Sequence, residues 1–504
     1  VFGFGYFISN LYWITNSLTF DVNFKFIIPF ALILIPLFLG IFYGLVTFLC
    51  NFFNLKNKIS SILIFSIFFG GIEFLRSFIF GGFPWNLIVF SLSNNLHSLQ
   101  ILSYIGTYSL NLLSITIFLL PIIFFFKYKS LTKFLIFSLS LILVVINFLY
   151  GNLVIKNFEK KEYDNLSSII RVVSPNIPIE RFLSNQDTEK SINELISLSD
   201  PHDLKKTIFI YPEGIITSIY LRDLKFFKDI FKENYNINHK VILGINSISQ
   251  KQIYNSLIVL NNETELLYKY NKNKLVPFGE FLPFENFLKK IGLKKITQGY
   301  QSFSADDKRE ILEINQLKFI PLICYEIIYS GKINPNKNYY DFILNISEDG
   351  WFGKSIGPKQ HLTHSIFRSI EEGKNVIRST NNGISAFVNP KGQIIKQIKE
   401  KGYFDIDQIP HIRPAGVPTS VINHPPFIRM EGRSLPPLGH RMAKYKVPKE
   451  AITKPGKYIL QSRFRSRAEP IYFMKFVGAT EDMEQAINEW MIDIHPNAVE
   501  FEIR

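Results

Sequence analysis

The first 155 residues constrain the fold most, because they consist largely of long apolar runs. A helix needs about 20 apolar residues to cross a bilayer. Because such a helix satisfies its backbone hydrogen bonds internally, runs of this length predict a helical membrane domain. We expect about five spans, with the clearest near 26–50, 60–80, 98–126 and 134–152 and a more polar candidate at 2–20.

The placement of lysine predicts how this domain is oriented. Lys56 and Lys58 follow the first clear run, and three more lysines lie in 127–133, whereas 86–126 contains no Lys, Arg, Asp or Glu. Cytoplasmic loops of membrane proteins carry an excess of Lys and Arg. We therefore expect both lysine-bearing connections in the cytoplasm and the chain after about residue 155 outside. The chain starts without Met inside an apolar run, so we expect a bundle truncated at its N-terminus.

Two charged residues lie within the second clear run. Glu73 and Arg76 are three positions apart, so on a helix they can face each other and form a structural ion pair inside the membrane. The segment 81–85, Gly-Gly-Phe-Pro-Trp, is expected to end that helix at the outer interface, where Trp is favoured. It could equally form the floor of a lipid-entry site, which makes Trp85 a candidate lipid contact.

From about residue 165 to 408 the pattern changes to short β-branched runs that alternate with polar, helix-like stretches. This alternation predicts a layered α/β domain. The expected strands are 169–173, 207–211, 241–245, 255–260, 319–324 and 340–346. Several of them end at polar residues, and the ends of strands are where such folds place their functional sites.

The composition changes again near residue 409, beyond which all five methionines lie. The tail 409–504 is expected to be a loop-rich arm followed by a small α+β unit, and it resembles no family. Its expected elements are strands at 458–464, 471–477 and 499–503 and a helix at 481–491.

Cys324 is the candidate nucleophile of the α/β domain, since it directly follows an expected strand. A thiol attacks an acyl carbon as the thiolate, so it needs a base or a positive neighbour. Glu213 is the candidate base, and Lys272 would stabilise the oxyanion of a tetrahedral intermediate. Glu280 and Glu326 could keep that lysine charged. Each residue also has a structural interpretation: a packed thiol, a carboxylate that caps a turn, and one lysine among many.

Three motifs together carry a resemblance. Tyr-Pro-Glu-Gly at 211–214, Tyr-x-Lys-x-x-Leu-Val-Pro-Phe-Gly-Glu at 270–280 and Cys-Tyr-Glu at 324–326 resemble the Glu-Lys-Cys motifs of the nitrilase superfamily. With the apolar N-terminal part, residues 1–408 resemble the apolipoprotein N-acyltransferase family. Further matching segments are 174–177, 349–353, 360–361, 368–371 and 378–385. The resemblance implies a membrane domain at 1–155 and a nitrilase-like α-β-β-α sandwich at 165–408.

The same resemblance implies a function. Glu213 would be the general base, Lys272 the oxyanion-stabilising amine and Cys324 the nucleophile that takes an acyl chain from a phospholipid as a thioester. The acceptor would be the amino group of a diacylglyceryl-cysteine apolipoprotein, in the bacterial inner membrane with the catalytic domain facing the periplasm. No cofactor is implied. The supporting and loop residues that it implies are Glu280, Tyr325, Glu326, Trp351 and Phe352.

The sequence departs from the family pattern in three places. Residue 348 is Glu where the family usually has Asn, two N-terminal spans are not found, and the hydrophilic tail stands in place of a closing transmembrane helix. Two alternatives therefore stay open. One is a membrane-tethered amidase or nitrilase that hydrolyses a carbon–nitrogen bond with the same triad, and the other is a folded but inactive scaffold.

The remaining composition bears on partners. The formal charge of +14 comes from lysines dispersed along the chain rather than from a basic stripe, so anionic lipid is the expected partner and nucleic acid is not. The nine histidines show no metal-ligand spacing, so no metal is expected. The segment 281–301 mixes Phe and Leu with Lys, and we expect it to form a loop that gates lipid entry.

Overall fold

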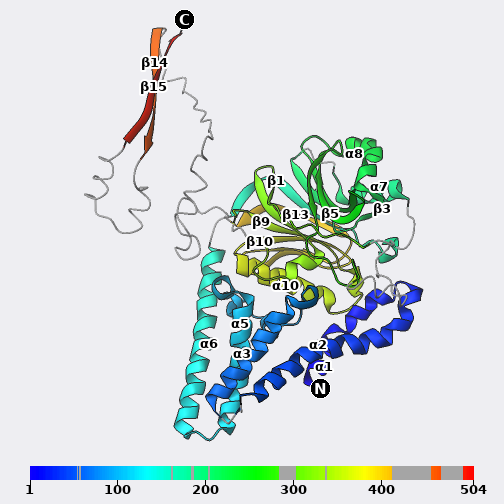
Figure 1. Ribbon diagram of the computed structural model, residues 1–504. Coiled ribbons are helices and arrows are strands. Elements are labelled where there is room, and N and C mark those ends of the chain that lie inside the picture. The colour runs from blue at the N-terminus through cyan, green and yellow to red at the C-terminus, as the bar shows by residue number, and fades with distance from the viewer. Residues whose placement is uncertain are drawn as a thin grey trace. The chain divides into compact units, whose positions relative to one another are not determined.

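The computed structural model describes residues 1–410, apart from 54, 56, 57, 161, 162, 183–186, 202–204, 283–301 and 335–337, and the strands 456–466 and 492–503. The chain divides into two compact units, residues 1–412 and residues 413–504. The first unit holds the apolar helices, the α/β domain and every residue of the candidate site (Figure 1).

In the described residues, four helical segments are long and apolar enough to cross a membrane. They contain α2 (Ile28–Asn51), α3 (Ile59–Arg76), α5 (Leu102–Leu119) and α6 (Ser130–Glu159). The expected span at 2–20 is not among these four; that segment forms the ten-residue helix α1 (Phe2–Leu11), followed directly by a 3-10 helix (Tyr12–Leu18).

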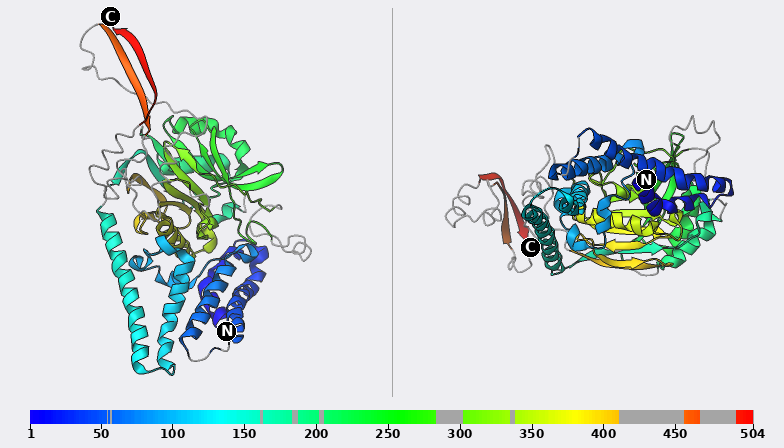
Figure 2. Two further views of the ribbon diagram at one scale, coloured as in Figure 1. Left: turned by 60° about the vertical axis from the view of Figure 1, so that its left-hand side comes forward. Right: turned by 90° about the horizontal axis from the view of Figure 1, so that it is seen from below.

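The two lysine-bearing connections lie at the same end of these helices. α2 leads into one connection and α3 leads out of it, while α5 and α6 flank the other. Figure 1 and the left view of Figure 2 both show the end of α2, the start of α3 and the turn from α5 to α6 at the end of the helices that points away from the α/β domain. The α/β domain therefore lies at the end of the helices opposite to these two connections.

The ion pair expected within the apolar helices is part of a larger buried network. The Glu73 carboxylate accepts hydrogen bonds from Tyr43 Oη on α2 at 2.7 Å and from Asn111 Nδ2 on α5 at 2.6 Å. Arg76 Nη2 lies 3.7 Å from Glu73 Oε1, and Arg76 Nη1 donates to two backbone carbonyls of 83–85. The pair thus joins three helices and fixes the segment that leaves α3.

Two β-sheets form the centre of the α/β domain. The first has the order β13-β1-β2-β4-β5-β6, with β3 paired to β4, and the second has the order β12-β11-β10-β9-β8-β7. The strands of the first sheet are β1 (Tyr163–Ser174), β2 (Thr207–Ile210), β3 (Ile216–Tyr220), β4 (Lys240–Ser249), β5 (Gln252–Leu260), β6 (Leu266–Asn271) and β13 (Gly402–Pro410). Those of the second are β7 (Leu312–Ile314), β8 (Leu317–Ile323), β9 (Phe342–Glu348), β10 (Asn375–Asn381), β11 (Ser385–Val388) and β12 (Ile394–Ile398). All six strands expected in this domain are present.

Helices cover the outer faces of both sheets. Alternate residues of β1 and β2 point to opposite faces, so that Val172 and Ile210 pack between the sheets while Val173 and Phe209 pack with α7 (Thr188–Ser199) and α8 (Lys228–Asn234). α10 (Gly357–Glu372) covers the second sheet. This order of layers is the predicted α-β-β-α sandwich.

α10 also joins the α/β domain to the apolar helices. Its Glu371 Oε1 accepts a hydrogen bond from Thr107 N of α5 at 2.9 Å, and Arg368 of α10 donates to Thr107 Oγ1. Arg368 and Glu371 are themselves paired at 2.8 Å. Because these side chains are buried, the contact fixes one outer layer of the sandwich to a membrane-spanning helix.

In the second unit, the described residues form an antiparallel pair of strands, β14 (Gly456–Ser466) and β15 (Ile492–Ile503). These strands include the expected strands 458–464 and 499–503. The expected strand 471–477, the expected helix 481–491 and nearly all of the expected lipid gate 281–301 lie outside the described residues.

Candidate active site

Cys324 occupies an unusual backbone conformation directly after β8. Its φ is +50°, in the left-handed region that is uncommon for residues other than glycine. The Cys324 carbonyl oxygen accepts a hydrogen bond from Asn345 Nδ2 at 3.3 Å and lies 3.3 Å from His361 Nε2. Strand β9 and helix α10 thus hold the sharp turn that starts the 3-10 helix Cys324–Ile328.

The buried carboxylate of Asp349 holds His361, one of the two side chains that contact the Cys324 carbonyl oxygen. Asp349 Oδ1 accepts from Ser347 Oγ at 2.8 Å, lies 2.9 Å from His361 Nδ1, and both of its carboxylate oxygens accept from Arg378 Nη2 at 2.9 Å. Burial alone would raise the pKa of Asp349, but the charge of Arg378 and the contact with His361 hold it well below its usual range. Asp349 is therefore a permanent negative charge beneath the cysteine turn.

Lys272 follows β6 and points into the space between two carboxylates. Its side chain is 1% exposed, and Nζ donates to Glu213 Oε1 at 3.1 Å and to Glu280 Oε1 at 2.9 Å. Burial would lower the pKa of Lys272, but the two carboxylates outweigh it and raise the pKa well above its ordinary value. The ammonium group is therefore charged at neutral pH.

Asn255 on β5 bridges the same two carboxylates. Its Nδ2 donates to Glu213 Oε1 at 2.7 Å and to Glu280 Oε1 at 2.8 Å. The second oxygen of Glu280 accepts from Val276 N at 2.8 Å. Asn255 was not among the predicted site residues, and the available signal was a pair of polar residues, Asn255 and Ser256, directly before the apolar run 257–260 of the strand.

Glu213 lies in the turn after β2, where a glycine on β4 makes room for it. A Cβ at Gly244 would lie 2.6 Å from Glu213 Cα, closer than real side chains approach. Gly244 N donates to Pro212 O and Ile215 N donates to Gly244 O, both at 3.1 Å, so the turn is fastened to the strand. Glu213 Oε2 then accepts from the backbone N–H of Glu348 at 3.0 Å.

The thiol of Cys324 interacts with both Glu213 and Lys272. Burial raises the pKa of the thiol, and the negative charge of Glu213 raises it further, whereas the charge of Lys272 and a hydrogen bond with Ser347 oppose this shift. The net pKa lies well above the ordinary value, so the buried thiol is protonated at neutral pH. Attack on an acyl carbon therefore requires that a neighbouring base accept the thiol proton, and Glu213 is the carboxylate whose charge acts most strongly on the thiol.

Tyr325 and Tyr329 tie the cysteine turn to the apolar helices. Tyr325 Oη donates to Gly82 O at 2.7 Å, and Tyr329 Oη donates to Gly81 O at 2.9 Å. Both glycines have positive φ and lie in the segment that leaves α3. The backbone next to Cys324 is thus held at the end of a membrane-spanning helix.

Glu326 has a different place from the one expected. Its carboxylate accepts from Tyr270 Oη at 2.7 Å, Ile323 N at 2.8 Å, Asn273 N at 2.9 Å and Arg309 Nη2 at 2.9 Å. Within the described residues, Glu280 rather than Glu326 provides the second carboxylate contact of Lys272. Glu326 instead holds the backbone before Cys324 and after Lys272 in one place.

Trp85 is buried between the two parts of the first unit. It is 2% exposed, and its Nε1 donates to Gln360 Oε1 at 2.9 Å, as does Trp13 Nε1. Its ring also packs on His364 of α10 with centroids 4.8 Å apart. Trp85 is therefore a packing residue in this structure and offers no surface to lipid.

Trp351 and Phe352 form an aromatic loop between the N-terminal segment and the turn before α7. The Trp351 ring is half-buried and lies 6.0 Å from the ring of Phe20 and 5.3 Å from that of Phe182. Phe352 packs edge-on against Trp13 at 4.7 Å. A Cβ at Gly214 would lie 3.0 Å from the ring of Phe182, so this loop lies near the turn that carries Glu213.

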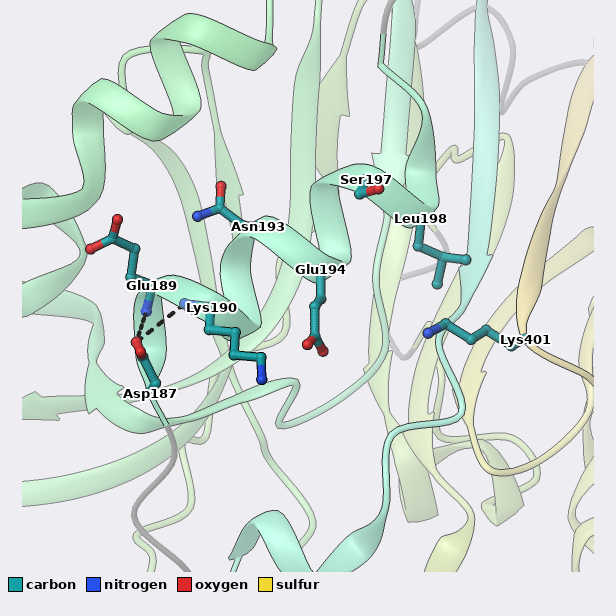
Figure 3. Close-up of a pocket in the computed structure, with 8 residues that line it drawn as sticks. All are labelled: Asp187, Glu189, Lys190, Asn193, Glu194, Ser197, Leu198 and Lys401. Atoms are coloured by element: carbon teal, nitrogen blue, oxygen red, sulfur yellow. Dashed lines mark hydrogen bonds between the residues drawn. The ribbon is translucent and has the colours of Figure 1, made fainter.

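A pocket of about 700 Å³ lies along α7 at a different place (Figure 3). Asp187 caps the helix there by accepting from Glu189 N and Lys190 N. Among the described contacts, none joins the lining of this pocket to Glu213, Lys272 or Cys324. Its lining residues are Asp187, Glu189, Lys190, Asn193, Glu194, Ser197, Leu198 and Lys401. The mixed charges and open form of this pocket suit solvent rather than an acyl chain.

Comparison with known protein families gives matches to two parts of the chain. Residues 221–407 match the carbon-nitrogen hydrolase family, and residues 1–120 match the N-terminal domain family of apolipoprotein N-acyltransferases. A solved carbon-nitrogen hydrolase superfamily structure from Xanthomonas campestris is 13% identical, with a TM-score of 0.35 over 48% of this chain and 89% of that chain. The family matches and the sheet topology, rather than this solved structure, identify the class of protein. The chain is a membrane protein with a carbon-nitrogen hydrolase domain.

Curated relatives narrow the assignment. Apolipoprotein N-acyltransferases of Rickettsia prowazekii, Agrobacterium fabrum and Rhizobium rhizogenes are 33%, 31% and 30% identical to the chain. The alignments cover 79%, 78% and 80% of this chain and 79%, 75% and 78% of those relatives. The chain belongs to the apolipoprotein N-acyltransferase family, which confirms the predicted family and enzyme class.

Proposed function

We propose that this protein transfers a fatty acyl chain from a phospholipid to the N-terminal amine of diacylglyceryl-cysteine apolipoproteins. Family membership supports the reaction class. The observation that carries the mechanism is the buried Lys272 ammonium, held between Glu213 and Glu280 beside the protonated thiol of Cys324. A nucleophile, a base and a fixed positive charge are what acyl transfer through a covalent intermediate requires.

The first half-reaction forms the acyl-enzyme. Glu213 accepts the thiol proton as Cys324 Sγ attacks the ester carbonyl carbon of the phospholipid. The resulting oxyanion is stabilised by the Lys272 ammonium. The C–O bond then breaks, and Glu213 returns the proton to the departing oxygen, which leaves a lysophospholipid and a thioester on Cys324.

The second half-reaction transfers the chain to the amine. The α-amino group of the lipoprotein attacks the thioester carbon, Glu213 accepts a proton from the attacking nitrogen, and the C–S bond breaks. The proton passes to the departing sulfur and restores the thiol, the form that burial favours. Lys272 stabilises the oxyanion in both halves, so one fixed charge serves two transition states.

We also propose that the catalytic domain faces the periplasm from the bacterial inner membrane. The two lysine-bearing connections lie at the opposite end of the helices, and such loops are typically cytoplasmic. Tyr325 and Tyr329 bind the end of α3, which keeps the cysteine turn next to the membrane surface from which a phospholipid would enter.

The reaction is tested with the full chain in phospholipid vesicles that carry a labelled acyl chain and a synthetic diacylglyceryl-cysteine peptide. The expected product is the N-acylated peptide. Release of the label only as free fatty acid would support a hydrolase, and no turnover of either kind would support the inactive scaffold. Cys324→Ala should abolish product, whereas Cys50→Ala is the matched control because Cys50, the other cysteine, is buried in α2.

A further inference from the structure

A second buried ion pair lies behind the proposed base. Arg181 belongs to the 3-10 helix Ile179–Phe182 that follows β1, and Glu348 is the last residue of β9. Their side chains form an ion pair, and each is 1% exposed. The pair therefore joins the first sheet's connecting segment to the end of a strand in the second sheet.

The arginine also holds the turn that carries Glu213. Arg181 Nε and Nη2 donate to the carbonyl oxygen of Gly214 at 3.2 and 3.1 Å. Gly214 has a φ of +52°, and a Cβ there would lie 3.0 Å from the ring of Phe182. The same ring packs on the guanidinium, with the centroid 4.4 Å from Cζ. Arg181 thus fixes the residue directly after the proposed base.

Glu348 contacts the proposed base, Glu213, through its backbone N–H. The backbone N–H of Glu348 donates to Glu213 Oε2 at 3.0 Å. The Glu348 carboxylate accepts from Gly350 N at 2.7 Å and from Asn381 Nδ2 at 2.8 Å, so its backbone is held by its own side chain. A buried carboxylate without a cation is strongly unfavourable, and Arg181 supplies that cation.

We propose that Arg181 is a positioning residue for acyl transfer, acting through Glu348 and Gly214 to hold the Glu213 carboxylate in place. The proposal rests on Glu213 being the base of the proposed function. With Oε2 fixed by Glu348 N, Oε1 stays with Lys272 and Asn255. Small displacements of a base are costly, since about 1 Å can lower a rate by about 10²-fold.

The test measures the rate at which Cys324 forms a thioester with labelled phospholipid in vesicles, over a range of pH. Arg181→Met should lower the rate about 10-fold or more at high pH and add a loss of rate with rising pH. Burial already raises the pKa of Glu348, and removing the charge of Arg181 raises it further, so the carboxyl group is neutral at low pH and becomes an unpaired buried anion as the pH rises. Adding Glu348→Gln to this variant removes that charge. The double variant should recover to within about threefold of the original rate, with the original pH profile.

Arg171→Met is the matched control. Arg171 is also buried in the first sheet, pairs with Asp405 at 2.7 Å and donates to two backbone carbonyls, but it makes no contact with the turn of Glu213 among the described residues. Its variant should lower the melting temperature and leave the pH profile in place. A merely structural role for Arg181 would give the same result, and that result would overturn the proposal.

Two further variants keep the outcomes distinct. Glu213→Gln tests the proposed function: if thioester forms at the original rate without this carboxylate, the base itself is misassigned. If Glu213→Gln is inactive while Arg181→Met behaves like Arg171→Met, only the positioning role fails. Should Arg181→Met not fold, Arg181→Lys keeps the charge but not the fork that reaches both Gly214 and Glu348. Its rate should fall about threefold or more, and an unchanged rate would overturn the proposal.

Discussion

Replacing Glu213 by Gln should make the thiol of Cys324 easier to ionise and, at the same time, lower the rate of acyl transfer. In the protein, the negative charge of Glu213 adds to burial in raising the pKa of the thiol. The substitution removes this charge and leaves the Lys272 ammonium, which favours the thiolate. The thiolate therefore becomes easier to form, although the group that accepts its proton during catalysis is lost.

The size of both effects follows from the site. A like charge within about 4–6 Å typically shifts a pKa by about 1–3 units, so the thiol pKa should fall by about that amount. Since the thiolate fraction changes about tenfold per unit, alkylation at fixed pH should accelerate about tenfold or more. Loss of the general base should lower the rate of thioester formation by about 10²- to 10⁴-fold.

The assay is the rate of iodoacetamide labelling of Cys324, followed by mass spectrometry between pH 6 and pH 10, beside the rate of thioester formation. Glu280→Gln is the matched control, because Glu280 contacts the same ammonium at 2.9 Å and is not among the main charges acting on the thiol. An alkylation profile of Glu213→Gln that stays in place or moves to higher pH would refute the electrostatic reasoning.

Three further predictions concern single contacts. Lys272→Met should lower thioester formation by about 10²- to 10³-fold, measured by single-turnover acylation, because it removes the oxyanion's positive charge. Gly244→Ala should cost about 1–3 kcal/mol in the free energy of unfolding, measured by chemical denaturation, since the new methyl group would overlap Glu213 Cα. The pKa of Asp349 is lowered on folding, so its stabilisation is complete above the ordinary value near 3.9 and is lost as the pH falls below it. Asp349→Asn should therefore be less stable at pH 7 and lose less of its melting temperature between pH 5 and pH 3.

Much of the fold follows from local sequence patterns. The strands that precede Glu213 and Cys324, β2 and β8, are apolar on both faces. Runs of β-branched residues between turn residues predict such strands from the sequence. β6 gave a weaker signal, because its first four residues are exposed. The segment 2–20 forms two consecutive short helices, Phe2–Leu11 and Tyr12–Leu18, and hydropathy records apolar length without showing where one type of helix gives way to the other.

The site could be predicted only where a motif carried it. Glu213, Lys272 and Cys324 stand in recognisable motifs, and the structure brings these three residues together. Arg181 and Glu348 are 167 residues apart in the chain, and their pairing depends on how the two sheets face each other. No local pattern records such a contact, so it became visible only in the folded protein.

The most direct test of the account is the chemical state of Cys324 when phospholipid is supplied without an acceptor. We expect the peptide that contains Cys324 to gain the mass of one acyl chain, in a linkage that neutral hydroxylamine cleaves, and to lose it when the diacylglyceryl-cysteine peptide is added. Cys324→Ala should carry no such modification. N-acylated peptide formed without an acylated Cys324, or a stable acyl group at another residue, would contradict the account.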